Sequence, residues 1–264
     1  MHQILIAGGG IGGLAAALAC QRAGWHVRLH ERASAFGEEG AGVQLGPNAV
    51  RCLAAWGLMA PLRAVACFPE ALQVRSALDG AQLARMDLGR AVAERYGAAY
   101  VTVHRADLHG LLHQAARELP QVQLHLRHQL MHFSQQAHGV SARVRTADGA
   151  QLQIEADALL GADGLHSRVR DVMLGVVGED VAGHVAYRAV VSQQALPLAL
   201  RTQVVTVWLG PRLHVVHYPV RGGEWLNVVV IREGQAREDL RRWDHAADVV
   251  ELLPALEGIC TSLQ

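Results

Sequence analysis

The chain has 264 residues, of which 51% are hydrophobic and 18% charged, as in globular proteins with a buried core. Its 24 basic residues, all of them arginine, balance 24 acidic ones, so no net charge attracts nucleic acid or an anionic membrane surface. The four cysteines form no CxxC pair and the fifteen histidines no HExxH motif. We therefore expect reduced thiols and no metal site.

The N-terminal segment has the pattern of a βαβ unit. Residues 2–7 are an apolar run of strand length, Leu14–Arg22 is rich in helix-forming Ala and Leu, and Trp25–His30 is a second strand. The uncharged stretch Ile4–Cys20 is interrupted by five glycines and has no basic segment before it, which argues against a signal peptide and a membrane span. We expect a cytoplasmic protein.

Helical and strand patterns alternate along the rest of the chain. We predict helices at 48–58, 105–119 and 235–256, and strands at 71–76, 81–86, 157–161, 184–191, 203–209, 213–220 and 225–231, with antiparallel strands over 122–154. This order predicts an α/β fold. We expect one domain, residues 1–70 and 96–180, to be Rossmann-like, with a parallel sheet and a β-meander. It is interleaved with a second, mainly antiparallel domain, residues 71–95 and 181–264.

A glycine-rich turn joins the first strand to the first helix. Gly8, Gly10 and Gly13 fit GxGxxG: the first glycine allows a tight turn, the second lets a pyrophosphate approach the backbone, and the third lets helix and strand pack closely. The helix N-terminus offers free N–H groups to phosphate. Glu31 closes the second strand at the distance expected of a carboxylate that accepts the adenosine ribose hydroxyls. The segment is therefore predicted to bind a dinucleotide.

The residues after this unit distinguish FAD from NAD. A dehydrogenase that binds NAD would continue into further βα units, but this chain continues with Glu31-Arg32 and the stretch GAGVQLGPNA. The sequence resembles the flavoprotein aromatic-ring hydroxylases of the para-hydroxybenzoate hydroxylase superfamily, in particular the salicylate and 3-hydroxybenzoate hydroxylase branch. The blocks that carry the resemblance are GGGIGG at 8–13, Glu31-Arg32, residues 40–49, His104–Leu108 and Leu160–Arg170, with a weaker likeness through Tyr187-Arg188 and 214–220 to Asn227.

The resemblance implies that FAD is the cofactor. Arg105 is similar to an arginine that reaches the phosphate and ribityl region of the flavin; its alternative is an ordinary helix-surface arginine. Asp163 is similar to an aspartate near the pyrophosphate and the route of the nicotinamide donor; its alternative is an aspartate satisfied within its own turn. Gly42 would lie beside the isoalloxazine ring, and the Leu130 backbone at the adenine edge. The predicted cofactor-binding residues are Gly8, Gly10, Ile11, Gly13, Glu31, Arg32, Gly42, Val43, Arg105, Leu130 and Asp163.

The resemblance also places substrate-pocket residues in the predicted strand 213–220. His214 and Tyr218 differ by four, so an unbroken strand directs both to one face of a sheet, with His217 on the other. A neutral imidazole can accept a phenol proton, and a tyrosine hydroxyl can hydrogen-bond a carboxylate or phenol. We predict both as catalytic and substrate-binding residues, with Arg188 as partner of a substrate carboxylate. The alternative is that His214 and Tyr218 pack in a sheet core.

The implied function is an FAD-dependent monooxygenase that hydroxylates a small aromatic acid or phenol through a flavin C4a-hydroperoxide. Its co-substrates would be NADH or NADPH and molecular oxygen; a homodimer is expected, and no nucleic acid, membrane or metal. Members of the superfamily carry a further Gly-Asp segment followed by Ala-Ala-His-Pro that completes the flavin pocket, which is not found here, so we expect the chain to lack it. The alternatives are a catalytically silent relative that binds FAD or an adenine nucleotide, and another flavin-dependent oxidoreductase of the superfamily.

Overall fold

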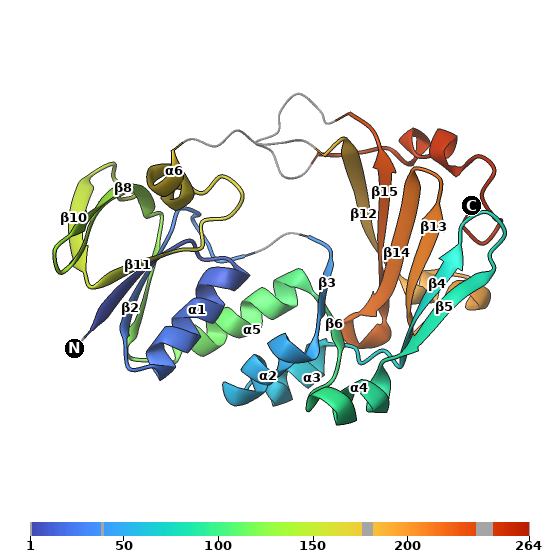
Figure 1. Ribbon diagram of the computed structural model, residues 1–264, viewed down its shortest axis with the longest axis horizontal. Helices are drawn as coiled ribbons and strands as arrows, with labels where there is room; N and C mark the ends of the chain where they lie inside the picture. Colours follow the sequence, from blue (N-terminus) through green and yellow to red (C-terminus); the bar gives the residue numbers. More distant parts are fainter. Residues whose placement is uncertain (1, 38–39, 176–181, 236–244, 264) are drawn as a thin grey trace. The chain divides into compact units, whose positions relative to one another are not determined.

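The computed structural model describes residues 2–37, 40–175, 182–235 and 245–263 (Figure 1). The chain forms two compact units, each assembled from two separate stretches. Unit 1 comprises Met1–Glu39 and Ala106–Glu179, and unit 2 comprises Gly40–Arg105 and Asp180–Gln264. Residues 40–70 and 96–105, which we predicted within the first domain, thus belong to unit 2. The reason is that β3 (Gly42–Leu45) pairs with β6 (Val101–His104) rather than with the parallel sheet. The function of each domain stays a prediction.

Unit 1 is built on a parallel sheet in the order β11-β1-β2-β7. Alternate residues of its strands face opposite sides, so Val27 and Leu29 are buried on one face and Leu5 and Ala7 on the other. The strand β7 had been predicted among antiparallel strands. It runs parallel to β2, and the long connection between the two strands, which ends in the helix α5, allows this direction. The elements are β1 (Gln3–Ala7), α1 (Ile11–Arg22), β2 (His26–Glu31), α5 (Arg105–Arg117), β7 (Val122–Leu126) and β11 (Ala158–Gly161).

A three-stranded antiparallel meander packs on the Leu5 face of this sheet. It consists of β8 (Gln129–Gln136), β9 (Gly139–Arg145) and β10 (Gln151–Ala156), in the order β10-β9-β8. Its inward side chains share a core with the sheet and with the helix α6 (Arg168–Leu174), which the sequence reading did not predict; the buried members are Leu5, Ala7, Leu130, Ala142, Val144, Ile154 and Val169. Unit 1 therefore has the predicted parallel sheet with βαβ and meander.

Unit 2 is built on a six-stranded sheet in the order β12-β15-β14-β13-β4-β5, in which all neighbours are antiparallel except β13 and β4. A small β3-β6 ladder and three helices complete it. The elements are α2 (Pro47–Ala55), α3 (Met59–Val65), β4 (Ala71–Ser76), β5 (Gln82–Asp87), α4 (Gly89–Tyr96), β12 (His184–Ser192), β13 (Val205–Gly210), β14 (Leu213–Val220) and β15 (Trp225–Glu233), with 3-10 turns η1 (Gln193–Ala195), η2 (Leu198–Leu200) and η3 (Arg221–Gly223).

The prediction of a mainly helical 235–256 is wrong for the part that the structure describes. Residues 236–244 lie outside the described residues, and 245–256 contain only two 3-10 turns, η4 (Val249–Glu251) and η5 (Leu253–Leu256). Asp248 caps the first turn, and Pro254 lies at the start of the second. Proline has no N–H to donate and clashes with the preceding turn, so one continuous helix cannot run through this position.

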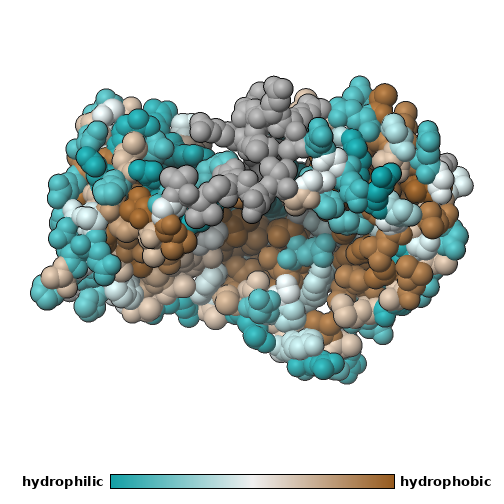
Figure 2. All heavy atoms as spheres, turned by 45° about the horizontal axis from the view of Figure 1, so that its top comes forward, coloured by the Kyte–Doolittle hydropathy of each residue, from teal (hydrophilic) through white to brown (hydrophobic). Residues whose placement is uncertain are grey.

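The two faces of the large sheet have separate cores. On one, which we call the Tyr218 face, the buried residues are Leu88, Val205, Tyr218 and Val220. The other, the Trp208 face, carries Ala77, Trp208, Leu213, Val215 and Ile259. Hydrophobic side chains are also exposed on both units (Figure 2), including Leu165, Met173, Leu174, Leu198 and Val249. Exposed apolar residues are common on protein surfaces and do not by themselves mark a site. No helix in the described ranges is long and apolar enough to cross a membrane.

Candidate functional site

The glycine-rich turn lies at the carboxyl edge of the parallel sheet, between β1 and α1. Gly8 has φ of 104°, a left-handed conformation that favours glycine, and a Cβ on it would lie 2.3 Å from the Ala162 carbonyl oxygen. A Cβ on Gly13 would lie 1.9 Å from the Gly8 carbonyl oxygen. Gly10 is the N-cap of α1 and makes no side-chain cap, so the first N–H groups of the helix keep their capacity to bind an anion.

The turn that contains Asp163 lies beside the glycine-rich turn. Strands β1 and β11 are parallel neighbours, and the Ala162 N–H donates to the Ala7 carbonyl at 2.8 Å. The Asp163 carboxylate accepts hydrogen bonds from the Ser167 hydroxyl at 2.6 Å and from the backbone N–H groups of Arg168 at 2.7 Å and Val169 at 3.1 Å. In this structure the carboxylate therefore holds the start of α6. The predicted role of Asp163 toward a cofactor stays a prediction.

Glu31, the last residue of β2, directs its carboxylate at the glycine-rich turn. Its Oε2 accepts the Gly9 N–H at 2.6 Å and its Oε1 accepts the Ala33 N–H at 2.7 Å. A carboxylate has about four lone-pair positions, so two remain for ribose hydroxyls. Arg32 follows as an exposed residue in a bend, and Ile11 is the first residue of α1. The sequence-predicted residues of unit 1 thus gather at one edge of its sheet, except for Leu130.

Leu130 lies in β8, within the stretch predicted to form antiparallel strands. Its side chain is 8% exposed and belongs to the core between the sheet and the meander. The register of β8 with β9 shifts between Leu130 and His132, which marks an irregularity of the strand at this point. A contact of the Leu130 backbone with an adenine edge stays a prediction.

Two residues at the turn, Gly9 and His109, are not among those predicted from the sequence. Gly9 occupies a variable position of GxGxxG, yet a Cβ on it would lie 2.6 Å from the Phe36 ring and 2.9 Å from the Glu31 Cβ. The Gly9 carbonyl is 2.8 Å from Nε2 of His109, which is 3% exposed on α5. The run of three glycines was a usable signal for Gly9. Nothing in the sequence pattern pointed to His109, 100 residues away.

In unit 2, Gly42 and Val43 lie on β3, and Gly42 is held by a buried asparagine. Its N–H donates to Oδ1 of Asn227, which is fully buried on β15, at 2.6 Å. A Cβ on Gly42 would lie 2.5 Å from a ring carbon of Tyr218 and 2.9 Å from Val220. The Tyr218 ring therefore leaves no space for a side chain at position 42. This is a reason for glycine within unit 2, in addition to the flavin contact that the resemblance implies.

Tyr218 is buried beside a second tyrosine. The Tyr100 hydroxyl donates to Oε1 of Gln44, and Tyr218 also forms a hydrogen bond with Gln44. Burial raises the pKa of Tyr100 to about 12. Burial and the neighbouring Tyr100 raise the pKa of Tyr218 to about 12, against a smaller opposing effect of the Gln44 hydrogen bond. Both phenols are therefore protonated at neutral pH and can donate hydrogen bonds.

The register of β14 with β15 is unbroken from Leu213 to Val220, which directs His214 and Tyr218 to the same face, with Val216 between them. Arg188 on β12 pairs with Val229, which also pairs with Val216, so Arg188 belongs to this face too. Three residues predicted to contact substrate are thus brought to the Tyr218 face. Whether they contact a substrate stays a prediction.

His217 lies on the opposite face, as the spacing predicted. Its Nε2 accepts a hydrogen bond from the Trp208 indole N–H at 3.1 Å. Burial, with a smaller contribution from Arg75, lowers the pKa of His217 to about 4. This histidine is therefore a neutral member of the Trp208 core and is separated by the sheet from His214.

Arg105 begins α5, directly after β6. Its backbone N–H donates to the Ala41 carbonyl at 3.1 Å, and a Cβ on Gly40 would lie 3.8 Å from the arginine Cδ. The side chain thus runs beside the loop that precedes Gly42. Its predicted role toward the flavin phosphate stays a prediction.

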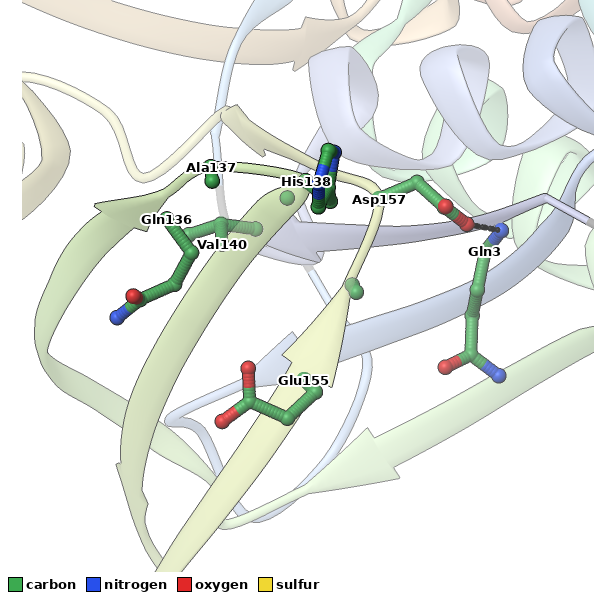
Figure 3. A pocket seen from close by; sticks show the side chains of 9 residues that line it. Gln3, Gln136, Ala137, His138, Val140, Glu155 and Asp157 are labelled. Carbon is green, nitrogen blue, oxygen red and sulfur yellow. Dashed lines mark hydrogen bonds between the residues drawn. The ribbon is translucent and has the colours of Figure 1, made fainter.

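A separate cavity of about 630 Å³ lies at the other end of β1 (Figure 3). It is lined by Gln3 and by the ends of the meander strands, with Glu155 and His138 among its polar residues. The Gln3 N–H donates to Oδ2 of Asp157 at 2.6 Å. In parallel sheets, ligands bind at the carboxyl ends of the strands, so this cavity is not the nucleotide site. Within the described residues, no cluster of three or more His, Cys, Asp or Glu side chains could hold a metal, and all four cysteines are free.

A parallel sheet with a glycine-rich turn and an acceptor carboxylate, joined to a separate sheet unit, defines a dinucleotide-binding protein. Residues 1–259 match the family described as FAD binding domain, and the chain belongs to this family.

Its relatives include aromatic hydroxylases. The chain is 37% identical over 257 residues to 3-hydroxybenzoate 6-hydroxylase of Polaromonas naphthalenivorans (strain CJ2), covering 97% of the chain and 62% of the relative. The values for the enzyme of the same name from Klebsiella oxytoca are 37% over 257 residues, 97% and 63%. Klebsiella pneumoniae HpxO, solved with FAD and uric acid, superposes with a TM-score of 0.78 at 25% identity, over 100% of this chain and 64% of that one. The chain spans less than two thirds of each of these proteins.

Proposed function

We propose that the chain acts as an FAD-dependent monooxygenase that hydroxylates a small aromatic acid or phenol, with NADH or NADPH and molecular oxygen as co-substrates. The observation that carries the proposal is the edge of unit 1 at which Glu31 and the uncapped start of α1 meet on the glycine-rich turn. The resemblance of the later blocks and the hydroxylase names of the relatives support the flavin chemistry. A cytoplasmic location and a homodimer stay predictions.

The residues of unit 1 fit the adenosine and pyrophosphate parts of FAD. A side chain at Gly8 or Gly13 would collide with neighbouring backbone atoms of the turn. Because glycines occupy these positions, the phosphates would meet main-chain N–H groups rather than side chains. Glu31 keeps two lone-pair positions for the ribose hydroxyls. Bound flavin would supply the transfer of electrons from NAD(P)H to oxygen, which no side chain of the protein can perform.

The Tyr218 face of unit 2 offers groups that match an aromatic acid. Arg188 would pair with a carboxylate, and the His214 imidazole would accept the proton of a phenol. Tyr218, whose pKa of about 12 keeps it protonated, would donate a hydrogen bond to a phenolate or carboxylate oxygen. The apolar neighbours Val216 and Val229 on this face would contact the ring and exclude water. Hydroxylated benzoates are therefore the substrate class that we propose.

The visible absorption spectrum of the purified chain tests the proposal most directly. We expect flavin bands, or their appearance after incubation with FAD. Hydroxybenzoates should then accelerate oxidation of NADH or NADPH together with oxygen uptake. Binding of FAD or ADP without stimulated oxidation would favour the catalytically silent alternative, and a colourless protein that binds neither would contradict both.

Glu31→Gln should weaken ADP binding about 10- to 100-fold, as expected for the loss of hydrogen bonds to a charged acceptor. In the wild type the two carboxylate oxygens of Glu31 accept the Gly9 and Ala33 N–H groups. In the glutamine variant the NH₂ group must replace one of these oxygens, so that it faces a backbone N–H and two donors oppose each other. Isothermal titration calorimetry with ADP measures the effect. Glu155→Gln, an exposed substitution in the same unit, is the matched control and should bind as the wild type does. If Glu31→Gln and Glu155→Gln bound ADP with equal affinity, Glu31 would not be part of the binding site.

A further inference from the structure

The peptide between Gly9 and Gly10 is held in one orientation by a buried histidine. His109 lies on α5, its side chain is 3% exposed, and its Nε2 is 2.8 Å from the Gly9 carbonyl oxygen. A carbonyl oxygen can only accept, so Nε2 carries the proton and donates it. The contact thus fixes both the position of the imidazole and the direction of the carbonyl.

The rest of Gly9 is enclosed as tightly. Its N–H donates to Glu31 Oε2 at 2.6 Å, and a Cβ on it would collide with the Phe36 ring. Phe36 in turn stacks on His113, the next histidine along α5, with ring centroids 4.4 Å apart. Glu31 and Phe36 therefore fix the N-terminal side of Gly9, and His109 fixes its carbonyl.

The direction of this carbonyl sets the direction of a phosphate donor. Within the described residues every peptide bond is trans, and in a trans peptide the C=O and the following N–H point in opposite directions. With the Gly9 carbonyl turned to His109, the Gly10 N–H is turned away from α5, and it makes no hydrogen bond to any residue that the structure describes. Both flanking residues are glycines, whose backbone rotates with little steric hindrance, so without His109 the peptide could flip.

We infer that His109 is a positioning residue for pyrophosphate binding: by holding the Gly9 carbonyl, it presents the Gly10 N–H to a phosphate oxygen of the dinucleotide. The inference rests on the proposed function, since the phosphate is that of the cofactor. It assigns His109 to the phosphates and not to the adenosine, whose ribose Glu31 would hold.

Replacement of His109 by two residues of similar size separates the hydrogen bond from packing. His109→Gln keeps an N–H donor on a flexible chain, whereas His109→Met fills similar space without one. We expect His109→Met to bind ADP about tenfold more weakly, the loss of about one hydrogen bond, and adenosine within twofold of the wild type. His109→Gln should regain most of the ADP affinity. Gln114→Met is the control: Gln114 is an exposed residue of the same helix whose side chain donates to Glu118 rather than to the glycine-rich turn, and this variant should bind ADP as the wild type does.

The outcomes are separable by titration calorimetry with ADP and adenosine. If the wild type binds neither ligand, the proposed function fails. If it binds ADP and His109→Met binds equally well, the inference alone is overturned, as it is if that variant loses ADP and adenosine in parallel. Should His109→Met not fold, ¹⁵N spectra of the wild type decide. The Gly10 amide resonance should then shift on addition of ADP but not of adenosine, and absence of that difference would overturn the inference.

Discussion

Gly13→Ala should destabilise unit 1 by about 3 kcal/mol or more and abolish ADP binding, because an inserted methyl group has no space. The added Cβ would lie 1.9 Å from the Gly8 carbonyl oxygen. Gly8 has little room to move away, because the Ala162 carbonyl lies close to it: a Cβ built on Gly8 would be 2.3 Å from that oxygen. The substitution must therefore separate α1 from the end of β1, which opens the turn that would hold the pyrophosphate. Urea unfolding followed by circular dichroism measures the first effect, and calorimetry with ADP the second.

The neighbouring glycine supplies a matched control. A Cβ on Gly12 would meet nothing within 4 Å, and Gly12 lies in the same helical turn. Gly12→Ala should therefore retain ADP binding and raise the free energy of unfolding by up to about 1 kcal/mol, since alanine favours helix over glycine. If Gly13→Ala were as stable as Gly12→Ala, close packing of the helix on the turn would not be the reason for glycine at position 13.

The sequence predicted best what depends on local pattern. The first βαβ unit follows from an apolar run, a glycine turn and an Ala-rich helix, all within about thirty residues, and the structure has these elements within one or two residues of the predicted ends except at the start of α1. That helix starts at Ile11, three residues before the predicted Leu14. The prediction placed the start too late because glycine has a low helix propensity and positions 12 and 13 are both glycine. In the structure, packing on β1 and β2 keeps both glycines helical. The alternation in β14 likewise placed His214, Tyr218 and His217 on their correct faces.

The contacts that fix the candidate site were not predictable, because they join distant segments. Asn227 accepts the Gly42 N–H across 185 residues, and His109 holds Gly9 across 100. Periodicity reports which face of an element is buried, but not which partner reaches a given N–H or carbonyl. For the same reason β7 was predicted among the antiparallel strands. Its sequence is compatible with a parallel or an antiparallel sheet, and only its pairing with β2 shows that it belongs to the parallel one.

Acidification should destabilise unit 1 through a stack of three histidines that the sequence reading did not predict. His30 and His125 are paired residues of β2 and β7, with parallel rings 4.8 Å apart, and Nδ1 of His30 lies 3.1 Å from Nδ1 of His128. Burial, then His125, His128 and Arg28 in that order, lowers the pKa of His30 from 6.5 to about 3. The pKa of His125 is also lowered, chiefly by burial and then by His128 and Arg28.

The sign follows from the depressed pKa of the folded state. Above pH 6.5 the imidazole of His30 is neutral in both states and its packing contributes fully. Between pH 6.5 and about 3 the unfolded chain binds a proton that the folded chain does not, so stability falls with pH. At about 1.4 kcal/mol for each pH unit, His30 alone should cost about 2 kcal/mol between pH 6.5 and 5. Urea unfolding at a series of pH values measures this slope.

Replacing His30 by glutamine should flatten that slope, at the cost of lower stability near neutral pH where the native imidazole packs well. His26→Gln removes a histidine from the same strand but outside the stack, and it should keep the wild-type slope. His217, which lies in unit 2 and has a pKa of about 4, adds its own acid sensitivity in all three proteins and cancels in the comparison. The backbone N–H of His128 donates to the Glu31 carbonyl at 2.9 Å. Loosening of the stack should therefore also displace Glu31, whose carboxylate is the candidate ribose ligand. Identical slopes for His30→Gln and His26→Gln would show that the stack carries no such linkage.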